Sequence, residues 1–525
     1  MKLKIKQWFL DKHNILFVLV LIIGAVVRLW QFGTLPCGLN QDEAFAGYQA
    51  FSLAEYGIDP FGYENPVYFT AWGSGMNALE SYLAIPFIKL FGLSVYTIRL
   101  PQVICAIISL PVVYSLLKEV TGNRRLSLIS MGLLAISPWH IMMSRWGLEA
   151  NLAPAFLLFG IFFFVKGVRR NWYFILSALF YGLALYTYAT TWILVPLVVL
   201  LSGIYLIFTK QKLMYRYIFS AAGVLFVLAL PLLLFVLINN GFMDEIRTSF
   251  ISIPKMQVIR NDELSIANLW TPSSYSNFFN LMVKQTDYTL WNSTEFGFFY
   301  LISIPFTVMG IVKLTINSFR SIRKREYDGY VLFWLALFCS VLTVLTLDYK
   351  NVNRSNVLFI NLLICTAIGV EAVVEFFENK DFNLANYTLA ALYAVYFLFF
   401  ASYYFGDYNW QISPDFRGGV GEAVEFVNDK DFESVNVDSS IHYPQILFYD
   451  QTPTDEFIDT VEYHNYPARY LTTKSFTKYT FGIDYENVDT SYDCYIIRVD
   501  QQGTFVSMGY TVEIFDQFAV AYISE

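Results

Sequence analysis

Two adjacent acids, Asp42 and Glu43, are the residues of this chain best suited to chemistry. They lie in the polar stretch LPCGLNQDEAFAGYQAFSL, directly after the first long apolar segment. An acidic pair can take a proton from an acceptor hydroxyl or hold a cation. The segment that follows is predicted to be helical, which places both carboxylates at a helix N-terminus, where negative charge is favoured. Helix capping alone is the alternative interpretation, although a cap needs only one acid.

Aromatic and amide side chains follow in GIDPFGYENPVYFTAWGSGMNALESY. Tyr68, Trp72 and Asn77 could bind a sugar, since flat rings suit its C–H faces and amides suit its hydroxyls. An aromatic belt at the membrane interface would produce the same composition.

A second polar group lies in SPWHIMMSRWGLEANLAP. This segment contributes four candidates for sugar or acceptor binding: His140, Arg145, Glu149 and Asn151. The alternative is an ion pair between Arg145 and Glu149 that only stabilises a helix, since residues four apart share a helical face.

Three cations could bind a phosphate. Lys350 and Arg354 lie in the short polar turn DYKNVNRSN, and Arg28 lies near the end of the first apolar segment. Arginine suits this task because its guanidinium makes bidentate contacts with phosphate. Arg28 could instead extend its charge to the interface or pair with Asp42 or Glu43. Arg99, in RLP, is expected to anchor at lipid headgroups.

The elements that must position these residues are membrane helices. The chain has 525 residues, is 56% hydrophobic and only 15% charged, and has a mean hydropathy of +0.46. A membrane-spanning helix needs about 20 apolar residues. Eleven spans are predicted, at 14–30, 99–117, 125–143, 152–167, 172–188, 190–208, 217–238, 297–315, 330–347, 356–377 and 387–405.

Basic residues orient the predicted spans. Clusters such as SFRSIRKRE mark the inner ends, so the N-terminus is predicted to be cytoplasmic. Segment 77–92 is predicted to lie in the outer interface; a short extra span is the alternative, but it would turn the basic clusters outward. The outer loops are then 31–98 and 239–296.

The last part of the chain has a different composition. From residue 407 to 525 there are 21 acids and 6 basic residues, a net charge of −15. SVNVDSS, QILFYD, YDCYIIRVD and FAVAYISE are predicted to be strands, and GGVGEAVEFVND a helix. We therefore predict a membrane module at 1–406 and a small extracytoplasmic α/β domain at 407–525.

Several classes of site are missing from the sequence. It contains no P-loop, GxSxG or HExxH motif, its five cysteines form no CxxC, and no segment resembles a nucleic-acid-binding motif. No cofactor or metal is expected, although Asp42, Glu43 and Asp262 could gather a divalent ion.

The first part of the chain resembles the membrane glycosyltransferases of the GT-C superfamily. The resemblance covers residues 20–155 and rests on VVRLW, LNQDEAFAGYQA, YLAIPFIKLFG and TIRLP, in that order. Glycosyltransferase family 39, which includes protein O-mannosyltransferases and the lipid A aminoarabinose transferase, is the most similar branch. The family's usual lysine-proline-proline stretch is replaced here by ENPVYFTAWGSG.

This resemblance implies a polyprenyl-phosphate sugar as donor. It implies that Asp42 is the catalytic carboxylate, that Glu43 is the second acid of the pair, and that Arg354 contacts the lipid phosphate. The hypothesis is an inverting transfer to a glycan, lipid or protein hydroxyl at the outer face of a bacterial plasma membrane. The alternatives are a transporter or flippase of lipid-linked sugars and a non-catalytic envelope scaffold.

Overall fold

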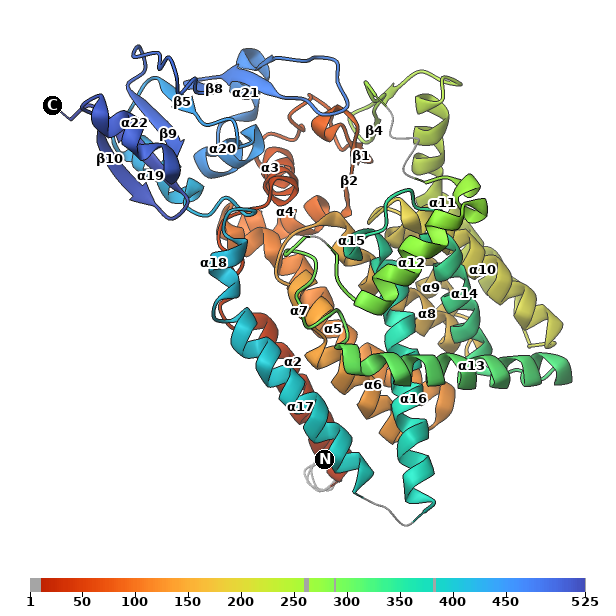
Figure 1. The fold of residues 1–525 in the computed structure, drawn as a ribbon. Coiled ribbons are helices and arrows are strands. Elements are labelled where there is room, and N and C mark those ends of the chain that lie inside the picture. The colour runs from red at the N-terminus through yellow and green to blue at the C-terminus, as the bar shows by residue number, and fades with distance from the viewer. Residues whose placement is uncertain (1–10, 259–263, 288, 381–383, 525) are drawn as a thin grey trace, which may run out of the picture.

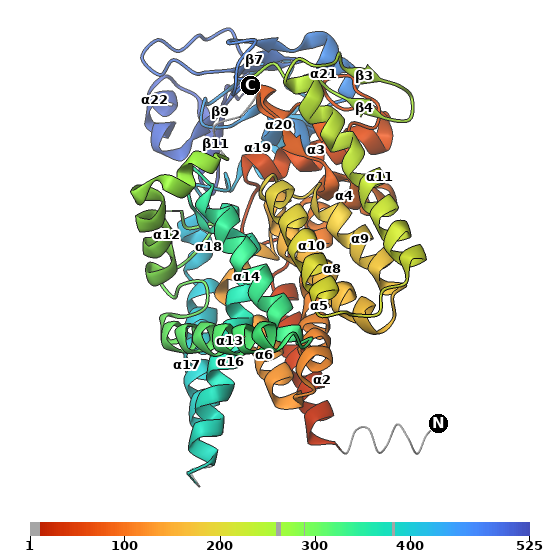
Figure 2. The same cartoon turned by 90° about the vertical axis from the view of Figure 1, so that its right-hand side faces the viewer.

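The chain forms a helical bundle with a sheet domain at one end (Figure 1). The computed structural model describes residues 11–258, 264–287, 289–380 and 384–524. Helices α3 (Gln41–Glu55) and α4 (Leu79–Phe91) lie between the bundle and the sheet domain. A quarter turn of the molecule shows the same two-part arrangement (Figure 2).

Each of the eleven predicted spans contains a helix. Within the described residues, eight helical segments are long and apolar enough to cross a membrane. Five of them are single helices: α2 (Lys12–Leu29), α5 (Val95–Thr121), α10 (Thr190–Phe208), α11 (Tyr215–Asn239) and α17 (Ala385–Tyr404). The other three centre on α8 (Ala153–Arg169), α13 (Ile304–Lys324) and α16 (Phe359–Glu378), each together with the short helical turns before it. The shorter apolar helices are α9 (Tyr173–Ala184) and α14 (Gly329–Leu345).

The predicted span 125–143 is two helices. α6 (Arg124–Ile136) ends at Ser137, and α7 (Pro138–Met143) begins directly after it. The residue before a proline is disfavoured in helical geometry, and Ser137 is extended with ψ of 123°. This break was missed because the apolar run continues across it.

The predicted span 297–315 has the wrong bounds. Its helix, α13, begins at Ile304 and continues to Lys324, and it lies across α16 instead of alongside it (Figures 1 and 2). A Cβ at Gly310 would overlap the carbonyl oxygen of Cys365, and one at Gly369 would overlap that of Phe306. Paired glycines thus let the two backbones touch, which is the usual basis of close packing between membrane helices.

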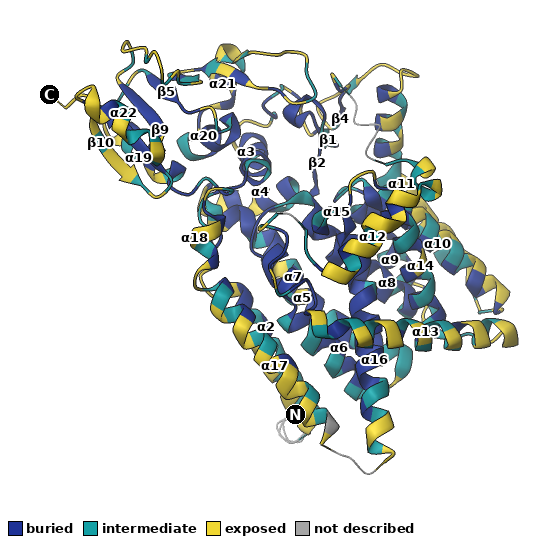
Figure 3. Cartoon of the chain, viewed as in Figure 1, coloured by how far each residue is buried: buried dark blue, intermediate teal, exposed yellow. Residues whose placement is uncertain are grey.

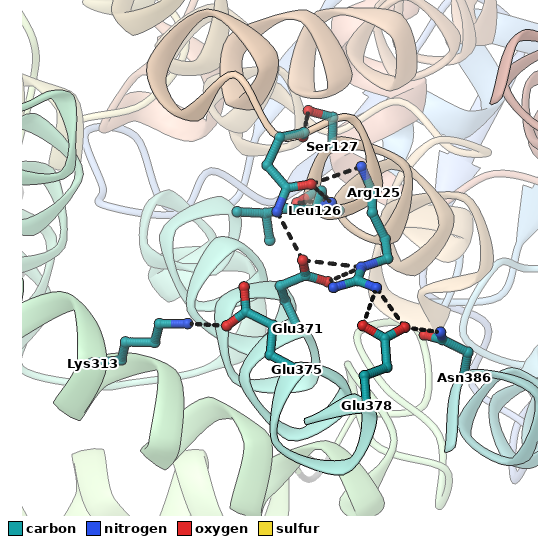
Figure 4. A network of polar contacts seen from close by, with 10 residues as sticks. Arg125, Leu126, Ser127, Lys313, Glu371, Glu375, Glu378 and Asn386 are labelled. Carbon is teal, nitrogen blue, oxygen red and sulfur yellow. Dashed lines mark hydrogen bonds and ion pairs between the residues drawn. The ribbon is translucent and has the colours of Figure 1, made fainter. Parts of the chain in front are cut away.

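A network of charges joins the helices at the end of the bundle opposite the sheet domain (Figure 4). Arg125 of α6 binds Glu371 and Glu378 of α16 at 2.9 and 2.7 Å. Lys313 of α13 binds Glu375 at 2.9 Å. The outward surfaces of α13 and α17 are exposed, whereas α8 and α16 are mostly buried (Figure 3). This pattern is expected if lipid surrounds the outer helices.

The C-terminal domain is built on one mixed sheet. Its described strands lie in the order β10-β11-β9-β5-β8-β7-β6, with β5 parallel to both neighbours. The strands are β5 (Val435–Val437), β6 (Glu462–Tyr463), β7 (Thr473–Phe476), β8 (Tyr479–Phe481), β9 (Cys494–Arg498), β10 (Thr511–Phe515) and β11 (Phe518–Tyr522). α19 (Val420–Asp429) and α20 (Tyr443–Asp450) cover one face, and α22 (Gln502–Ser507) packs on the other. A C-terminal α/β domain is therefore present, as predicted.

One predicted strand of this domain is wrong. QILFYD belongs to α20, which begins with a capping box between His442 and Gln445 and has Pro444 in its first turn. These are helix start signals. Helical geometry buries Ile446 and Phe448 in the core that the domain shares with α3, and an apolar run this short does not distinguish a strand from a buried helix.

That shared core attaches the C-terminal domain to the bundle. Phe45, Tyr48 and Phe51 of α3 pack in one cluster with residues of α19, α20 and the sheet. The Tyr48 hydroxyl donates to the Thr452 carbonyl at 2.8 Å, and a Cβ at Gly47 would lie 2.6 Å from the Phe448 ring. The helix that carries Asp42 and Glu43 is therefore part of both cores.

We expect Gly310→Ala to lower the free energy of unfolding by about 1–3 kcal/mol, the usual penalty of overpacking, because its Cβ meets backbone that cannot move aside. The matched control is Gly132→Ala in α6, whose Cβ meets nothing within 4 Å. Thermal unfolding of both variants in detergent measures the difference. Equal midpoints would contradict the close crossing of α13 and α16.

Candidate active site

Asp42 lies in the first turn of α3 and faces a cavity. The helix begins after Asn40, whose side-chain oxygen accepts a hydrogen bond from the Asp42 N–H at 3.0 Å. Asn40 is therefore the cap, and Asp42 is not needed for capping. The indole N–H of Trp72 donates to Asp42 Oδ1 at 3.0 Å, which fixes the orientation of this carboxylate.

Glu43 faces the protein interior. Its two carboxylate oxygens accept hydrogen bonds from Arg99 at 2.7 and 2.9 Å, and the Gly147 N–H donates to it at 2.6 Å. Both side chains of the ion pair are fully buried. The headgroup role expected for Arg99 is therefore wrong, and Glu43 does not take up the alternative pairing with Arg28: Arg99 is the internal partner of Glu43. It also donates to the carbonyls of Pro36 and Gly38, each at 2.9 Å.

Arg28 and His140 lie together inside the bundle, away from the cavity. The Arg28 guanidinium donates to the carbonyls of Gly24, Leu134 and Ala135 at 2.8–3.0 Å and lies 2.6 Å from His140 Nδ1. The structure does not bring either residue to the candidate site. Their contacts join α2 to α6 and α7.

Arg145 caps the C-terminal end of α2. Its guanidinium donates to five carbonyls at 2.6–3.3 Å, those of Val27, Arg28, Trp30, Gln31 and Leu35. Orphan carbonyls at a helix C-terminus need such donors. Its predicted ion pair with Glu149 is not formed; Glu149 instead accepts from the backbone N–H of Asn77.

A cavity of about 410 Å³ brings the acid together with a predicted phosphate ligand. Asp42, Glu149 and Arg354 all line it. Arg354 lies in α15 (Val352–Ser355), whose first turn is held by the side chains of Asn351 and Asp287 at 2.8 and 2.9 Å. The other lining residues are Asn40, Gln41, Trp146, Leu148, Ala150, Tyr188, Trp291, Asn351, Asn353, Asp415, Arg417, His442 and Gln445.

A second cavity of about 240 Å³ adjoins the first, since Glu149 and Tyr188 line both. Tyr68 and Asn77 line it together with apolar residues of α10 and α11, including Trp192 and Phe235. The ring centroids of Tyr68 and Phe235 are 4.4 Å apart. Two of the predicted sugar-binding residues therefore lie in this neighbouring space.

The remaining predicted residues line neither cavity. Trp72 contributes to the site by donating a hydrogen bond to Asp42. The backbone of Trp72 is left-handed, with φ of 56°. Lys350 is buried and donates to the Leu347 carbonyl at 2.7 Å. Asn151 is also buried, and neither polar atom of its side chain has a partner among the residues that the structure describes.

The C-terminal domain supplies the lining that the sequence analysis missed. Asp415, Arg417 and His442 reach the cavity from the segment after α18 (Tyr408–Ile412) and from the turn before α20. Burial raises the pKa of Asp415, and burial with the nearby Arg417 charge lowers the pKa of His442 to about 4. The imidazole is then neutral at neutral pH. No sequence motif marks these residues, which come close to Asp42 only through tertiary packing.

No group of three or more possible metal ligands occurs among the described residues. Asp262, the third acid of the predicted alternative ion site, lies outside the described residues. The arrangement itself offers a carboxylate base at one wall of a polar cavity and an arginine at another.

Comparisons with known proteins identify the fold. Residues 79–235 match the family described as dolichyl-phosphate-mannose-protein mannosyltransferase. ArnT from Cupriavidus metallidurans, in the apo state and bound to undecaprenyl phosphate, is 12% identical, with 97% of each chain covered and a TM-score of 0.58. The search of curated proteins found no match.

The Archaeoglobus fulgidus oligosaccharyltransferase in the apo form is 14% identical over 83% of this chain, with a TM-score of 0.51. The chain spans 64% of that protein's length. The predicted resemblance is confirmed at the level of the fold: the chain has the fold of ArnT and of this oligosaccharyltransferase, and residues 79–235 match a mannosyltransferase family.

The two adjacent acids are expected to respond differently to amide substitution. Glu43→Gln leaves the Arg99 charge buried without a counter-ion, and breaking a buried pair in this way typically destabilises a protein by about 3–5 kcal/mol. Asp42→Asn keeps the cap and faces the cavity, so its unfolding midpoint is expected to match that of the wild type. Thermal unfolding in detergent compares them. A Glu43→Gln variant as stable as Asp42→Asn would refute this division of roles.

Proposed function

We propose that this chain is an inverting glycosyltransferase that moves a sugar from a polyprenyl-phosphate donor to an acceptor hydroxyl. The observation that supports it is the position of Asp42, held by Trp72 at one wall of a cavity that Arg354 also lines. The fold of the GT-C glycosyltransferases is consistent with this activity.

Asp42 acts as the general base. It takes the proton of the acceptor hydroxyl as that oxygen attacks the anomeric carbon, and the bond from this carbon to the phosphate oxygen breaks. The polyprenyl phosphate leaves with the bonding electrons, and this single displacement inverts the configuration at the anomeric carbon. Glu43 touches no substrate in this scheme, because Arg99 and Gly147 occupy its oxygens; it positions the first turn of α3.

Arg354 compensates the charge that develops on the leaving phosphate. Fixed cationic donors at a developing charge are among the largest contributions to catalysis. Asn351 and Asp287 fix the backbone of α15 before any ligand binds, so little reorganisation is needed. Lys350 is directed to a backbone carbonyl, and we assign it no contact with the phosphate.

The adjoining cavity is the proposed path of the lipid chain or of the sugar. Its aromatic side chains, Tyr68, Trp192 and Phe235, offer an apolar surface next to the bundle. The donor would enter from the bilayer, and the acceptor from the side of the C-terminal domain. We place the site at the outer face of a bacterial plasma membrane, with the N-terminus cytoplasmic.

The other candidate functions make different predictions for the same assay. A lipid-linked sugar flippase needs polar groups along a path through the bundle, whereas Arg28 and Arg145 are bound to backbone carbonyls. A scaffold has no need of a carboxylate held by an indole N–H. Only a transferase releases polyprenyl phosphate from the donor.

The purified protein, given radiolabelled polyprenyl-phosphate hexoses and candidate envelope acceptors, is expected to release polyprenyl phosphate. Asp42→Asn should reduce the rate by about 10²–10⁴-fold, the usual contribution of a general base. Arg354→Gln should raise the KM for the donor and lower kcat. Arg169→Gln, an exposed residue paired with Glu119, is the control and should leave the rate unchanged.

Two results would overturn the proposal. One is normal turnover by Asp42→Asn. The other is failure of the wild type to release polyprenyl phosphate from every donor while it still binds the lipid, which would favour transport or scaffolding.

A further inference from the structure

The C-terminal domain presents one cationic side chain to the cavity that Asp42 lines. Arg417 lies between α18 and α19, in the segment SPDFRGG, and it lines the cavity together with Asp415 and His442. Figure 1 shows α18 on one side of α3 and α15 on the other. Arg417 and Arg354 therefore reach the same cavity from different parts of the molecule.

The conformation of the backbone fixes the position of Arg417. Its φ is 53°, a left-handed conformation that is uncommon for a residue with a side chain. A Cβ at Gly38, whose own φ is 67°, would overlap the carbonyl oxygen of Phe416. The segment is thus pressed against the turn that leads into α3, which fixes Arg417 relative to Asp42. Strained backbone of this kind is most common at functional sites.

The guanidinium of Arg417 is anchored by backbone carbonyls. Its Nε donates to the Ser440 carbonyl at 2.8 Å, and one terminal nitrogen donates to the Pro414 carbonyl. Within the described residues, Arg417 forms no ion pair with a carboxylate, not even with that of Asp415. Burial lowers the pKa of Arg417, against the nearby charges of Asp415 and Asp438, which raise it.

The neighbouring side chains leave this charge available to a ligand. The Gln445 amide donates to the Leu39 carbonyl at 2.8 Å and accepts from the His442 N–H at 2.9 Å. Its hydrogen bonds are thus made within the protein and not to the Arg417 guanidinium. The neutral His442 ring packs 5.9 Å from Trp72, which in turn holds Asp42. Arg417 is therefore the cation that the C-terminal domain contributes to the cavity, on the side from which we propose that the acceptor enters.

We propose that Arg417 binds an anionic group of the acceptor, a carboxylate or a phosphate close to the hydroxyl that attacks. This proposal rests on the proposed function of the same site. A guanidinium gives a carboxylate or phosphate two parallel hydrogen bonds, and it then orients the hydroxyl toward Asp42. The class of acceptor is thus an acidic glycan, lipid or peptide, and a neutral one is a poor substrate.

The first experiment measures binding and needs no turnover. Wild type, Arg417→Gln and Arg417→Lys are titrated with glucuronate and with glucose while polyprenyl phosphate saturates the donor site. The wild type is expected to bind glucuronate at least tenfold more tightly than glucose, and Arg417→Gln to lose this preference. Arg417→Lys should keep part of it. Arg498→Gln, an exposed arginine of the same domain paired with Asp500, is the control and should bind like the wild type.

The second experiment measures transfer to two acceptors that differ only in a carboxylate, an alkyl glucuronide and the matching alkyl glucoside. Arg417→Gln is expected to raise the KM for the glucuronide about 10–100-fold and to leave the KM for the glucoside and the donor unchanged. Unaltered unfolding midpoints would exclude a general loss of structure as the cause.

The other outcomes overturn either the anion site or the proposed transferase activity, and they can be told apart. If Arg417→Gln weakens the binding of polyprenyl phosphate as Arg354→Gln does, Arg417 holds the donor. If the wild type binds glucuronate no more tightly than glucose, and Arg417→Gln behaves in the same way, no anion site exists at this wall. If glucuronate binding depends on Arg417 but no donor is ever turned over, the proposed transferase activity fails while the anion site stands.

Discussion

The buried ion pair between Glu43 and Arg99 is the interaction on which the candidate site depends. Taking both charges out of water is costly, and the cost is offset only because two hydrogen bonds join them directly and neighbouring backbone groups satisfy the rest. This pair holds together four parts of the chain: α3, α5, the turn at 33–38 and the loop at Gly147. Asp42, one residue away, lines the cavity and accepts a hydrogen bond from Trp72.

The C-terminal domain is the second constraint. Its core is continuous with that of α3, where Gly47 lets Phe448 approach and Gly38 lets the segment of Arg417 approach. Small residues at these contacts set the distance between the two parts. The cavity is thus a joint product of the bundle and the domain, and neither part lines it alone.

Side chains of both charges line the cavity. Acids line it at Asp42, Glu149 and Asp415, and arginines at Arg354 and Arg417, which come from the bundle and from the domain respectively. In a partly desolvated space such charges act strongly on a ligand, since water screens them less than at an open surface. Two anion-binding positions around one base suit the leaving phosphate of a donor and an acidic acceptor.

Short stretches of the sequence were enough to predict the membrane helices, the α/β character of the C-terminal domain, and the candidate base at the start of α3, because hydropathy and local helix signals are properties of short segments. It also suggested Arg354 and Glu149, which do line the cavity. Three features became visible only in the folded molecule: the pairing of Glu43 with Arg99, the binding of Arg28 and Arg145 to backbone carbonyls, and the position of Arg417 at the cavity. Those outcomes depend on contacts between residues far apart in the chain, and the spacing of residue types carries no information about them.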